Sequence, residues 1–204
     1  MAKIFTFDVF VDYACPFVYG SSFWLDAVRR KSDYKLKITW KFFPLEQINH
    51  PDGPDSRFYA TPAGERSKGL LAMRGAIAAR NQGADAFNAF HLTYLKMKHV
   101  EKLEHGRKSV ILDAAKRCDL DMRRFEQNLD DVGALEIIGR DYEEARALGV
   151  FGTPTYVFPD GTNSYLQLYP PPPDRDAVAF FDEFIQLTRK KPWFREFKRC
   201  YPPQ

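Results

Sequence analysis

The chain has 204 residues, of which 45% are hydrophobic and 28% charged, and its formal net charge is +3. This composition is typical of a globular protein and excludes an intrinsically disordered chain. The basic clusters at 29–31 and 189–191 close predicted helices and form no basic face, so nucleic acid is not an expected partner. No apolar run reaches the ~18 residues of a membrane helix, and Asp8 and Asp12 interrupt any export signal. We therefore expect no membrane partner and a cytoplasmic location.

The cysteines are too few and too scattered for a disulfide framework. Cys15, Cys118 and Cys200 are odd in number and far apart, which is typical of a reducing compartment. Cys118 closes an apolar helical pattern, which predicts that it packs in the core. Cys200 lies in the C-terminal tail, where we expect no redox role. The four histidines show no ligand spacing, so no metal site is predicted.

Hydrophobic periodicity at the N-terminus predicts two strands joined by a helix. In the first strand, polar residues alternate with Phe5, Phe7, Val9 and Val11, with Phe10 as the exception. A break at 13–16 precedes the helix. The second strand has the cleanest alternation in the chain, with one face formed by Leu36, Ile38, Trp40 and Phe42. Two strands connected by one crossover helix are expected to be parallel.

The middle of the chain predicts helices and no strand. Thr61 and Pro62 form a good helix start, and Gly83 is a plausible stop. Further helices are predicted at 84–103, 107–118, 121–130 and 134–148, the last of them ended by Gly149.

Strand character returns at 155–158. A turn at 159–161 should lead into an antiparallel strand that the prolines of 170–173 end. This returning strand is expected to contain Tyr165, Leu166 and Leu168.

A last helix is expected to be capped by Asp174. Its inward side chains are predicted to be Val178, Phe181, Phe184, Ile185 and Leu187. The tail beyond it should pack against the domain through Trp193, Phe194 and Phe197.

The order of these elements is βαβ, then helices, then ββα. It predicts an α/β fold in which residues 1–60 and 149–204 form one domain, with residues 61–148 as a helical domain inserted between its two halves.

Cys15 lies where the first strand turns into a helix, at the end of the strand where ligands gather in open α/β sheets. Pro16 suits the first helical position because its φ is preset and it has no N–H to lose. Cys15 is then the N-cap residue, and both the free N–H groups and the helix dipole favour its thiolate form. Because the thiolate is the nucleophile in disulfide exchange, Cys15 is the predicted catalytic residue. Asp8 and Asp12 lie on the same strand face and could assist proton transfer, although a purely structural role is the commoner case.

Two motifs together indicate a family. Cys15-Pro16 after the first strand, and Gly-Val-Phe-Gly-Thr-Pro at 149–154 before a later one, resemble the DsbA family of thioredoxin-fold proteins. The likeness is greatest to its cytoplasmic, FrnE-like branch, and includes the stretch Trp-Lys-Phe-Phe-Pro-Leu-Glu at 40–46. The resemblance implies a thioredoxin-like fold with Pro154 in the cis form against Cys15. It also implies that Thr153 offers its backbone to a bound peptide or to glutathione, much like an added strand.

One departure from that family concerns position 18. The redox members carry Cys-x-x-Cys, whereas this chain has Cys-Pro-Phe-Val, so Val18 stands where the second thiol would be. We therefore expect a monothiol oxidoreductase in which Cys15 forms a mixed disulfide with glutathione or a protein, and an outside thiol resolves it. Pro16, Phe17 and the Thr153-Pro154 pair are the expected substrate-binding residues. No tightly bound cofactor is expected, with glutathione as a possible co-substrate.

Two other functions fit the same layout. The 2-hydroxychromene-2-carboxylate isomerases and kappa-class glutathione transferases resemble it but carry Ser where this chain has Cys15, and they activate bound glutathione without forming a disulfide. A peptide-binding module that lost catalysis together with its second cysteine is the other alternative. Neither the substrate nor the oligomeric state follows from the sequence.

Overall fold

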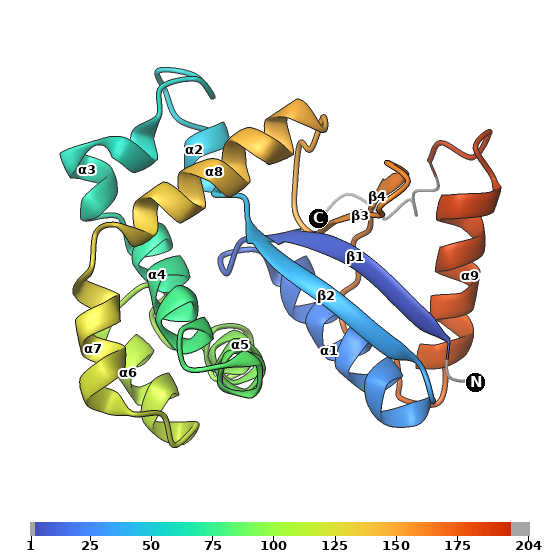
Figure 1. Ribbon diagram of the computed structural model, residues 1–204, viewed down its shortest axis with the longest axis horizontal. Coiled ribbons are helices and arrows are strands. Elements are labelled where there is room, and N and C mark those ends of the chain that lie inside the picture. Colours follow the sequence, from blue (N-terminus) through green and yellow to red (C-terminus); the bar gives the residue numbers. More distant parts are fainter. Residues whose placement is uncertain (1–2, 197–204) are drawn as a thin grey trace.

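A four-stranded mixed sheet forms the centre of the fold (Figure 1). The computed structural model describes residues 3–196. The strands are β1 (Ile4–Val11), β2 (Lys35–Phe42), β3 (Thr155–Val157) and β4 (Asn163–Tyr165), in the order β2-β1-β3-β4. β1 and β2 are parallel, as the crossover rule predicts, whereas β3 runs antiparallel to both β1 and β4. The expected α/β fold is therefore observed.

Two helices cover the same face of this sheet, α1 (Pro16–Lys31) and α9 (Ala177–Lys190). Phe7 of β1 lies against Phe181 of α9, with their ring centroids 6.4 Å apart. The indole N–H of Trp24 donates to the carbonyl of Ala177 over 3.0 Å, which joins α1 to the start of α9. Both helices end in basic residues, as the helix dipole favours.

The chain between β2 and β3 is helical. It contains α2 (Leu45–Ile48), a 3-10 turn η1 (Phe58–Ala60), α3 (Pro62–Glu65), α4 (Lys68–Arg80), α5 (Ala84–His99), α6 (Lys108–Arg117), α7 (Met122–Asp130) and α8 (Ala134–Ala147). The helix predicted from Thr61 to Gly83 is in fact two helices. Thr61 caps α3 as expected, but a second capping residue, Ser67, accepts the N–H of Leu70 and starts α4.

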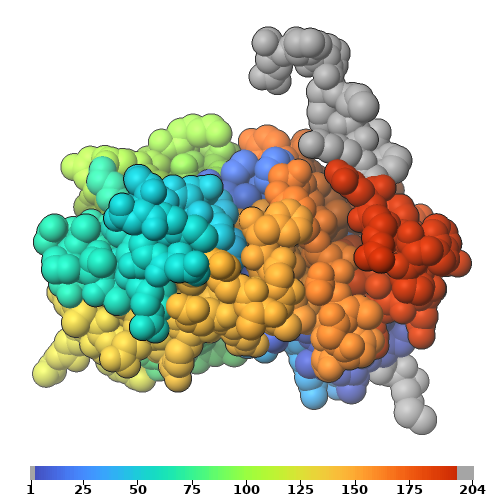
Figure 2. Space-filling model, turned by 90° about the horizontal axis from the view of Figure 1, so that it is seen from above, coloured from blue at the N-terminus to red at the C-terminus, as the bar shows by residue number. Residues whose placement is uncertain are grey.

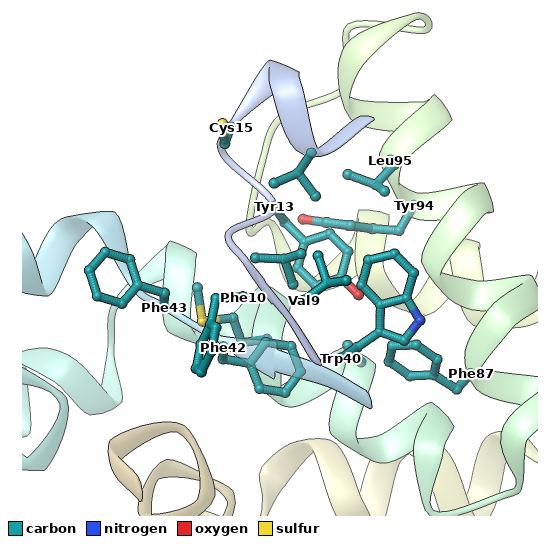
Figure 3. Packing of buried hydrophobic residues seen from close by; sticks show 14 of the residues in the cluster. Val9, Phe10, Tyr13, Cys15, Trp40, Phe42, Phe43, Phe87, Tyr94 and Leu95 are labelled. Atoms are coloured by element: carbon teal, nitrogen blue, oxygen red, sulfur yellow. The ribbon is translucent and has the colours of Figure 1, made fainter. Parts of the chain in front are cut away.

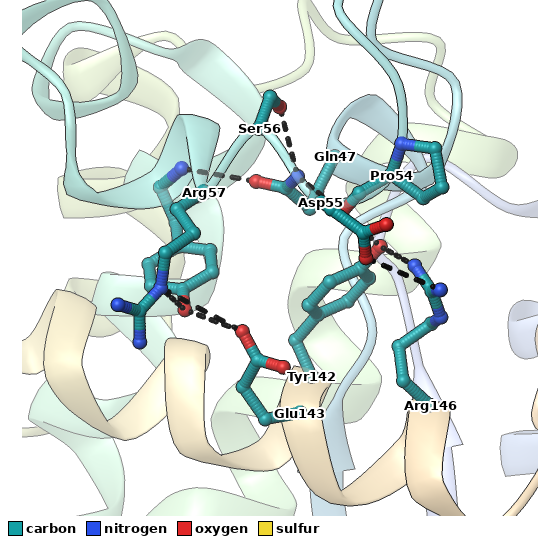
Figure 4. A network of polar contacts seen from close by, with 9 residues as sticks. Gln47, Pro54, Asp55, Ser56, Arg57, Tyr142, Glu143 and Arg146 are labelled. Atoms are coloured by element: carbon teal, nitrogen blue, oxygen red, sulfur yellow. Dashed lines mark hydrogen bonds and ion pairs between the residues drawn. The ribbon is translucent and has the colours of Figure 1, made fainter.

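The last of these helices, α8, joins the helical region to the sheet. The N–H of Phe42 in β2 donates to the Asp141 carboxylate (3.0 Å), and Lys41 pairs with Glu144 (2.5 Å). Figure 4 shows how α8 also holds the loop before η1, because the Tyr142 hydroxyl donates to the carbonyl of Pro54 over 2.9 Å. α8 therefore contacts both parts of the molecule.

The C-terminal part differs from expectation in several details. β4 ends at Tyr165, so Leu166 and Leu168 lie beyond the strand. The N-cap residue of α9 is Asp176, while the carboxylate of Asp174 pairs with Arg30. Either aspartate fits a capping pattern, so the local sequence does not distinguish them.

The predicted inward face of α9 is correct at Phe181, Phe184 and Ile185 and wrong at Leu187, which is exposed. The tail does not pack as predicted either, because Trp193 is 72% exposed and Phe194 is 37% exposed. Two further positions, Phe197 and Cys200, lie outside the described residues.

The beginning of α1 lies where the helical region meets the segment that follows α8. In the view from above, the blue N-terminal region reaches the surface between the green helices and the orange segment (Figure 2). This placement puts the turn before α1 next to residues from both parts of the chain.

Candidate active site

The turn between β1 and α1 carries Cys15. The N–H of Cys15 donates to the carbonyl of Asp12 (3.1 Å), and the N–H of Val18 donates to the carbonyl of Cys15 (3.2 Å). Cys15 is the N-cap of α1 with an extended backbone, and Pro16 opens the helix. Because Pro16 presets φ and has no N–H, the chain enters the helix abruptly and leaves Cys15 at the positive end of the helix dipole.

The segment before β3 faces this turn. The Cys15 thiol donates a hydrogen bond to the carbonyl oxygen of Thr153, with 3.2 Å between Sγ and O. The Thr153–Pro154 peptide bond is cis, and both residues are buried. The Thr153 hydroxyl is buried without a hydrogen-bond partner among the described residues. Two elements 138 residues apart in sequence thus meet at one sulfur atom.

The Cys15 side chain lies near the surface without being freely exposed. It is 6% exposed, and Figure 3 shows it at the tip of the turn, apart from the aromatic cluster that fills the interior. Of the two residues that follow it, Pro16 is exposed and Phe17 is half-buried. The buried Cys15 side chain is therefore followed directly by one exposed and one half-buried side chain.

The position of a second thiol in this turn is occupied by Val18, which is completely buried. Cys118 is half-buried at the end of α6, where its thiol donates to the Thr93 hydroxyl (3.4 Å), and burial raises the pKa of Cys118. Among the described residues, Cys15 is therefore the cysteine that lies at the junction of β1 and α1.

Asp12 stabilises the backbone of the turn. Its carboxylate accepts the N–H of Ala14 and the N–H of Leu45, each over 2.7 Å. Burial raises the pKa of Asp12 to about 6, although these two hydrogen bonds act in the opposite direction. Asp8 has a different environment, since its carboxylate pairs with Lys41 over 2.8 Å. The two acids of the predicted strand face therefore have separate structural roles.

An aromatic pair beside Cys15 was not predicted as part of the site. Phe151 is 69% exposed, and its ring centroid lies 5.0 Å from that of Tyr165. Burial raises the pKa of Tyr165, and the charge of Cys15 raises it further. A Cβ atom on Gly152 would lie 3.2 Å from the Tyr165 ring, so glycine permits this close packing. The one available signal in the sequence was an aromatic residue, Phe151, within a glycine-containing turn.

Two of the histidines lie behind the turn. Burial lowers the pKa of His91 to about 3 and also lowers the pKa of His99.

Across residues 3–196 no group of three or more His, Cys, Asp or Glu side chains could hold a metal ion. No helix in the same range is both long and apolar enough to cross a bilayer.

A sheet that begins with a βαβ unit and ends with ββα, with Cys15 at the first helix and a cis-proline opposite it, defines a thioredoxin-like protein with inserted helices. The family model described as DSBA-like thioredoxin domain matches residues 6–171. The chain therefore belongs to the DSBA-like thioredoxin domain family.

The chain is also similar to individual proteins and solved structures. An uncharacterized protein of Mycobacterium tuberculosis is 29% identical over 203 residues, which cover 97% of this chain and 83% of that protein. Among solved structures, the cytosolic disulfide reductase DsbM from Pseudomonas aeruginosa is similar with a TM-score of 0.61 at 17% identity, covering 89% of this chain and 99% of that chain. DsbM has also been solved with GSH. A 2-hydroxychromene-2-carboxylate isomerase is similar with a TM-score of 0.62 at 17% identity, covering 91% of this chain and 97% of that chain. At 17% identity, the similarity to DsbM and to the isomerase shows that this chain has the same fold as each of them.

Proposed function

We propose that this protein is a thiol–disulfide oxidoreductase that acts through the single thiol of Cys15. The observation that carries the proposal is the position of Sγ, at the N-cap of α1 and 3.2 Å from the carbonyl that precedes Pro154. This end of α1 is the positive end of the helix dipole. The Thr153 carbonyl accepts the S–H proton of the resting thiol and thereby orients the sulfur.

The reaction is an exchange that needs no bound cofactor. The Cys15 thiolate attacks one sulfur of a disulfide R–S–S–R′, forms the mixed disulfide Cys15–S–S–R and releases R′–S⁻, which takes up a proton. A second thiol, R″–SH, then attacks the mixed disulfide as its thiolate, forms R–S–S–R″ and returns the thiol of Cys15. Because Val18 supplies no internal thiol, R″–SH comes from solution, and glutathione is the class of thiol that we propose.

The residues around Cys15 would hold the partner. Thr153 and Pro154 directly precede β3 and lie beside the sulfur, and we propose that a bound peptide or glutathione lies along this segment, with Pro16 and Phe17 on the other side. The aromatic pair of Phe151 and Tyr165 extends this surface. A reducing compartment such as the cytoplasm suits a protein whose reacting thiol must be regenerated by another thiol.

The test is intact mass spectrometry after incubation with oxidised glutathione. We expect one glutathionyl group on the wild-type chain, removed again by reduced glutathione. Cys118→Ser is the matched control, because it removes a half-buried thiol and should still gain the adduct. Cys15→Ser should gain none. A wild-type chain that stays unmodified, or an adduct that maps to Cys118 or Cys200, refutes the proposal.

A glutathione-dependent isomerase is the second candidate, favoured by the absence of an internal partner thiol at Val18 and by the shared fold with 2-hydroxychromene-2-carboxylate isomerase. In that case the sulfur that reacts belongs to bound glutathione, and residue 15 donates a hydrogen bond to it. Cys15→Ser would then keep glutathione-dependent isomerisation, because a hydroxyl also donates. Disulfide exchange would disappear in the same variant, so one substitution separates the two functions.

A further inference from the structure

Three side chains of α5 converge on Tyr13, two residues before Cys15. They are His91, Tyr94 and His99, whose spacing puts them on one side of the helix. His99 Nε2 lies 3.0 Å from the Tyr13 carbonyl oxygen, and His91 Nδ1 lies 2.9 Å from the Tyr13 hydroxyl. The Tyr94 ring meets the Tyr13 ring edge to face, with 5.3 Å between centroids (Figure 3). Helix α5 thus holds Tyr13 by its backbone, its hydroxyl and its ring.

The peptide group between Tyr13 and Ala14 is held from both sides. Its carbonyl accepts from His99, and its N–H donates to Asp12 over 2.7 Å. Because a peptide group is planar, two hydrogen bonds on opposite sides fix its orientation. The next peptide group leads directly into Cys15, whose own N–H is bonded to the Asp12 carbonyl. The direction in which the Cys15 side chain points from the turn therefore depends on the orientation of the peptide plane between Tyr13 and Ala14.

His91 connects the same turn to α1. Its second nitrogen, Nε2, lies 2.8 Å from the hydroxyl of Ser22. A neutral imidazole has one donor and one acceptor nitrogen, and a hydroxyl can serve as either, so Tyr13, His91 and Ser22 form a satisfied chain of hydrogen bonds. The Trp40 ring lies against the imidazole, with 4.4 Å between centroids. The imidazole is thus fixed by contacts from β2, α1 and the turn.

Apolar side chains would fill this buried space but would not specify one orientation of a peptide plane. Hydrogen bonds do so, since a buried polar group left without its partner is costly. We propose that His99 and His91 are positioning residues for Cys15, and that through Tyr13 the helical region sets the angle at which the sulfur attacks a disulfide. This inference rests on the proposed thiol–disulfide exchange.

The experiment measures the rate at which each variant forms a mixed disulfide with oxidised glutathione, followed by intact mass. His99→Leu should slow the exchange by about tenfold or more, because a displacement of about 1 Å costs up to ~100-fold in rate. His99→Gln should restore the wild-type rate, since the Gln amide nitrogen can reach the position of Nε2 and donate to Tyr13. Rescue by Gln is a result that a space-filling role for His99 does not produce.

Ile111→Ala is the matched control for loss of stability. Ile111 is completely buried in α6 and faces Gly75 of α4, so its truncation leaves a cavity in the helical region without touching the turn. It should exchange at the wild-type rate while unfolding more readily. If His99→Leu fails to fold, Tyr13→Phe replaces it, because this change removes only the hydroxyl bonded to His91 and should also slow the exchange.

Several outcomes overturn the positioning role. These are wild-type exchange by His99→Leu or Tyr13→Phe, slow exchange by His99→Gln, and a loss in Ile111→Ala as large as that in His99→Leu. A wild-type chain that forms no mixed disulfide at all refutes the proposed function itself. The two failures are therefore distinguishable.

Discussion

Replacing Asp12 by Asn should change how the stability of the protein depends on pH. Burial, and to a lesser extent Glu46, raises the pKa of Asp12 from its ordinary 3.8 to about 6 in the folded chain. Between these two values the folded protein keeps a proton that the unfolded chain releases. The free energy of unfolding therefore falls as the pH rises through this window, and the stabilisation is complete only below about pH 4.

The size of the effect follows from the two pKa values. Each pH unit between 3.8 and about 6 corresponds to ~1.4 kcal/mol, so ionisation of Asp12 lowers the free energy of unfolding by about 3 kcal/mol across the window. An Asn side chain does not ionise, so the Asp12→Asn variant does not lose this free energy of unfolding as the pH rises. It has one acceptor oxygen for the two N–H groups of Ala14 and Leu45, so one of them loses its partner at a cost of ~1–3 kcal/mol at every pH.

The assay is urea unfolding followed by tryptophan fluorescence between pH 4 and pH 8. Relative to the wild type, Asp12→Asn should gain about 3 kcal/mol from the acid end to neutral pH. Asp33→Asn is the control, because Asp33 is an exposed carboxylate and its removal should leave the shape of the curve unchanged. If the free energy of unfolding of the wild type and of Asp12→Asn changed with pH in parallel, the raised pKa of Asp12 would be refuted.

Three further changes test the geometry around Cys15. Val18→Cys places a second thiol one turn along α1, and oxidised glutathione should then yield an internal disulfide between Cys15 and the introduced thiol in peptide mapping; a persistent glutathionyl adduct would contradict this. Gly20→Ala builds a Cβ only 1.8 Å from the Leu168 carbonyl oxygen, so the segment after β4 must move away from α1, and urea unfolding should show a loss of ~1–3 kcal/mol. An unchanged unfolding midpoint would show that this contact is easily relieved. Cys15→Ala removes the thiolate charge near Tyr165 and should lower the pKa of that phenol, measured by NMR with labelled tyrosine; an unmoved pKa would place the sulfur farther away.

Local patterns predicted the elements that position Cys15. The period-two alternation gave β1 and β2, and the Cys15-Pro16 step correctly predicted the start of α1, because each depends on neighbours within a few residues. Helix ends were less certain wherever two capping residues compete. Ser67 divides one predicted helix, and Asp176 replaces Asp174, for the same reason.

Contacts between distant segments were beyond prediction from local patterns. Tyr165 reaches the neighbourhood of Cys15 only through the register of β4 on β3. His91 and His99 show no motif, and their shared partner Tyr13 lies 78 and 86 residues away. Trp193 was expected to pack against the domain but is exposed, and nothing in the tail sequence specifies a partner for it. Such placements depend on the assembled fold.

The hydrogen bond between Cys15 and Thr153 also affects the order of events during synthesis. The thiol leaves the ribosome early, whereas its carbonyl partner follows 138 residues later, after every helix from α2 to α8 has been made. Domains generally fold as units while the chain is elongated, so the nascent chain carries Cys15 without this hydrogen-bond partner until three-quarters of the protein has been made. The hydrogen bond between Cys15 and Thr153 can therefore form only late in synthesis, once the segment that precedes β3 has left the ribosome.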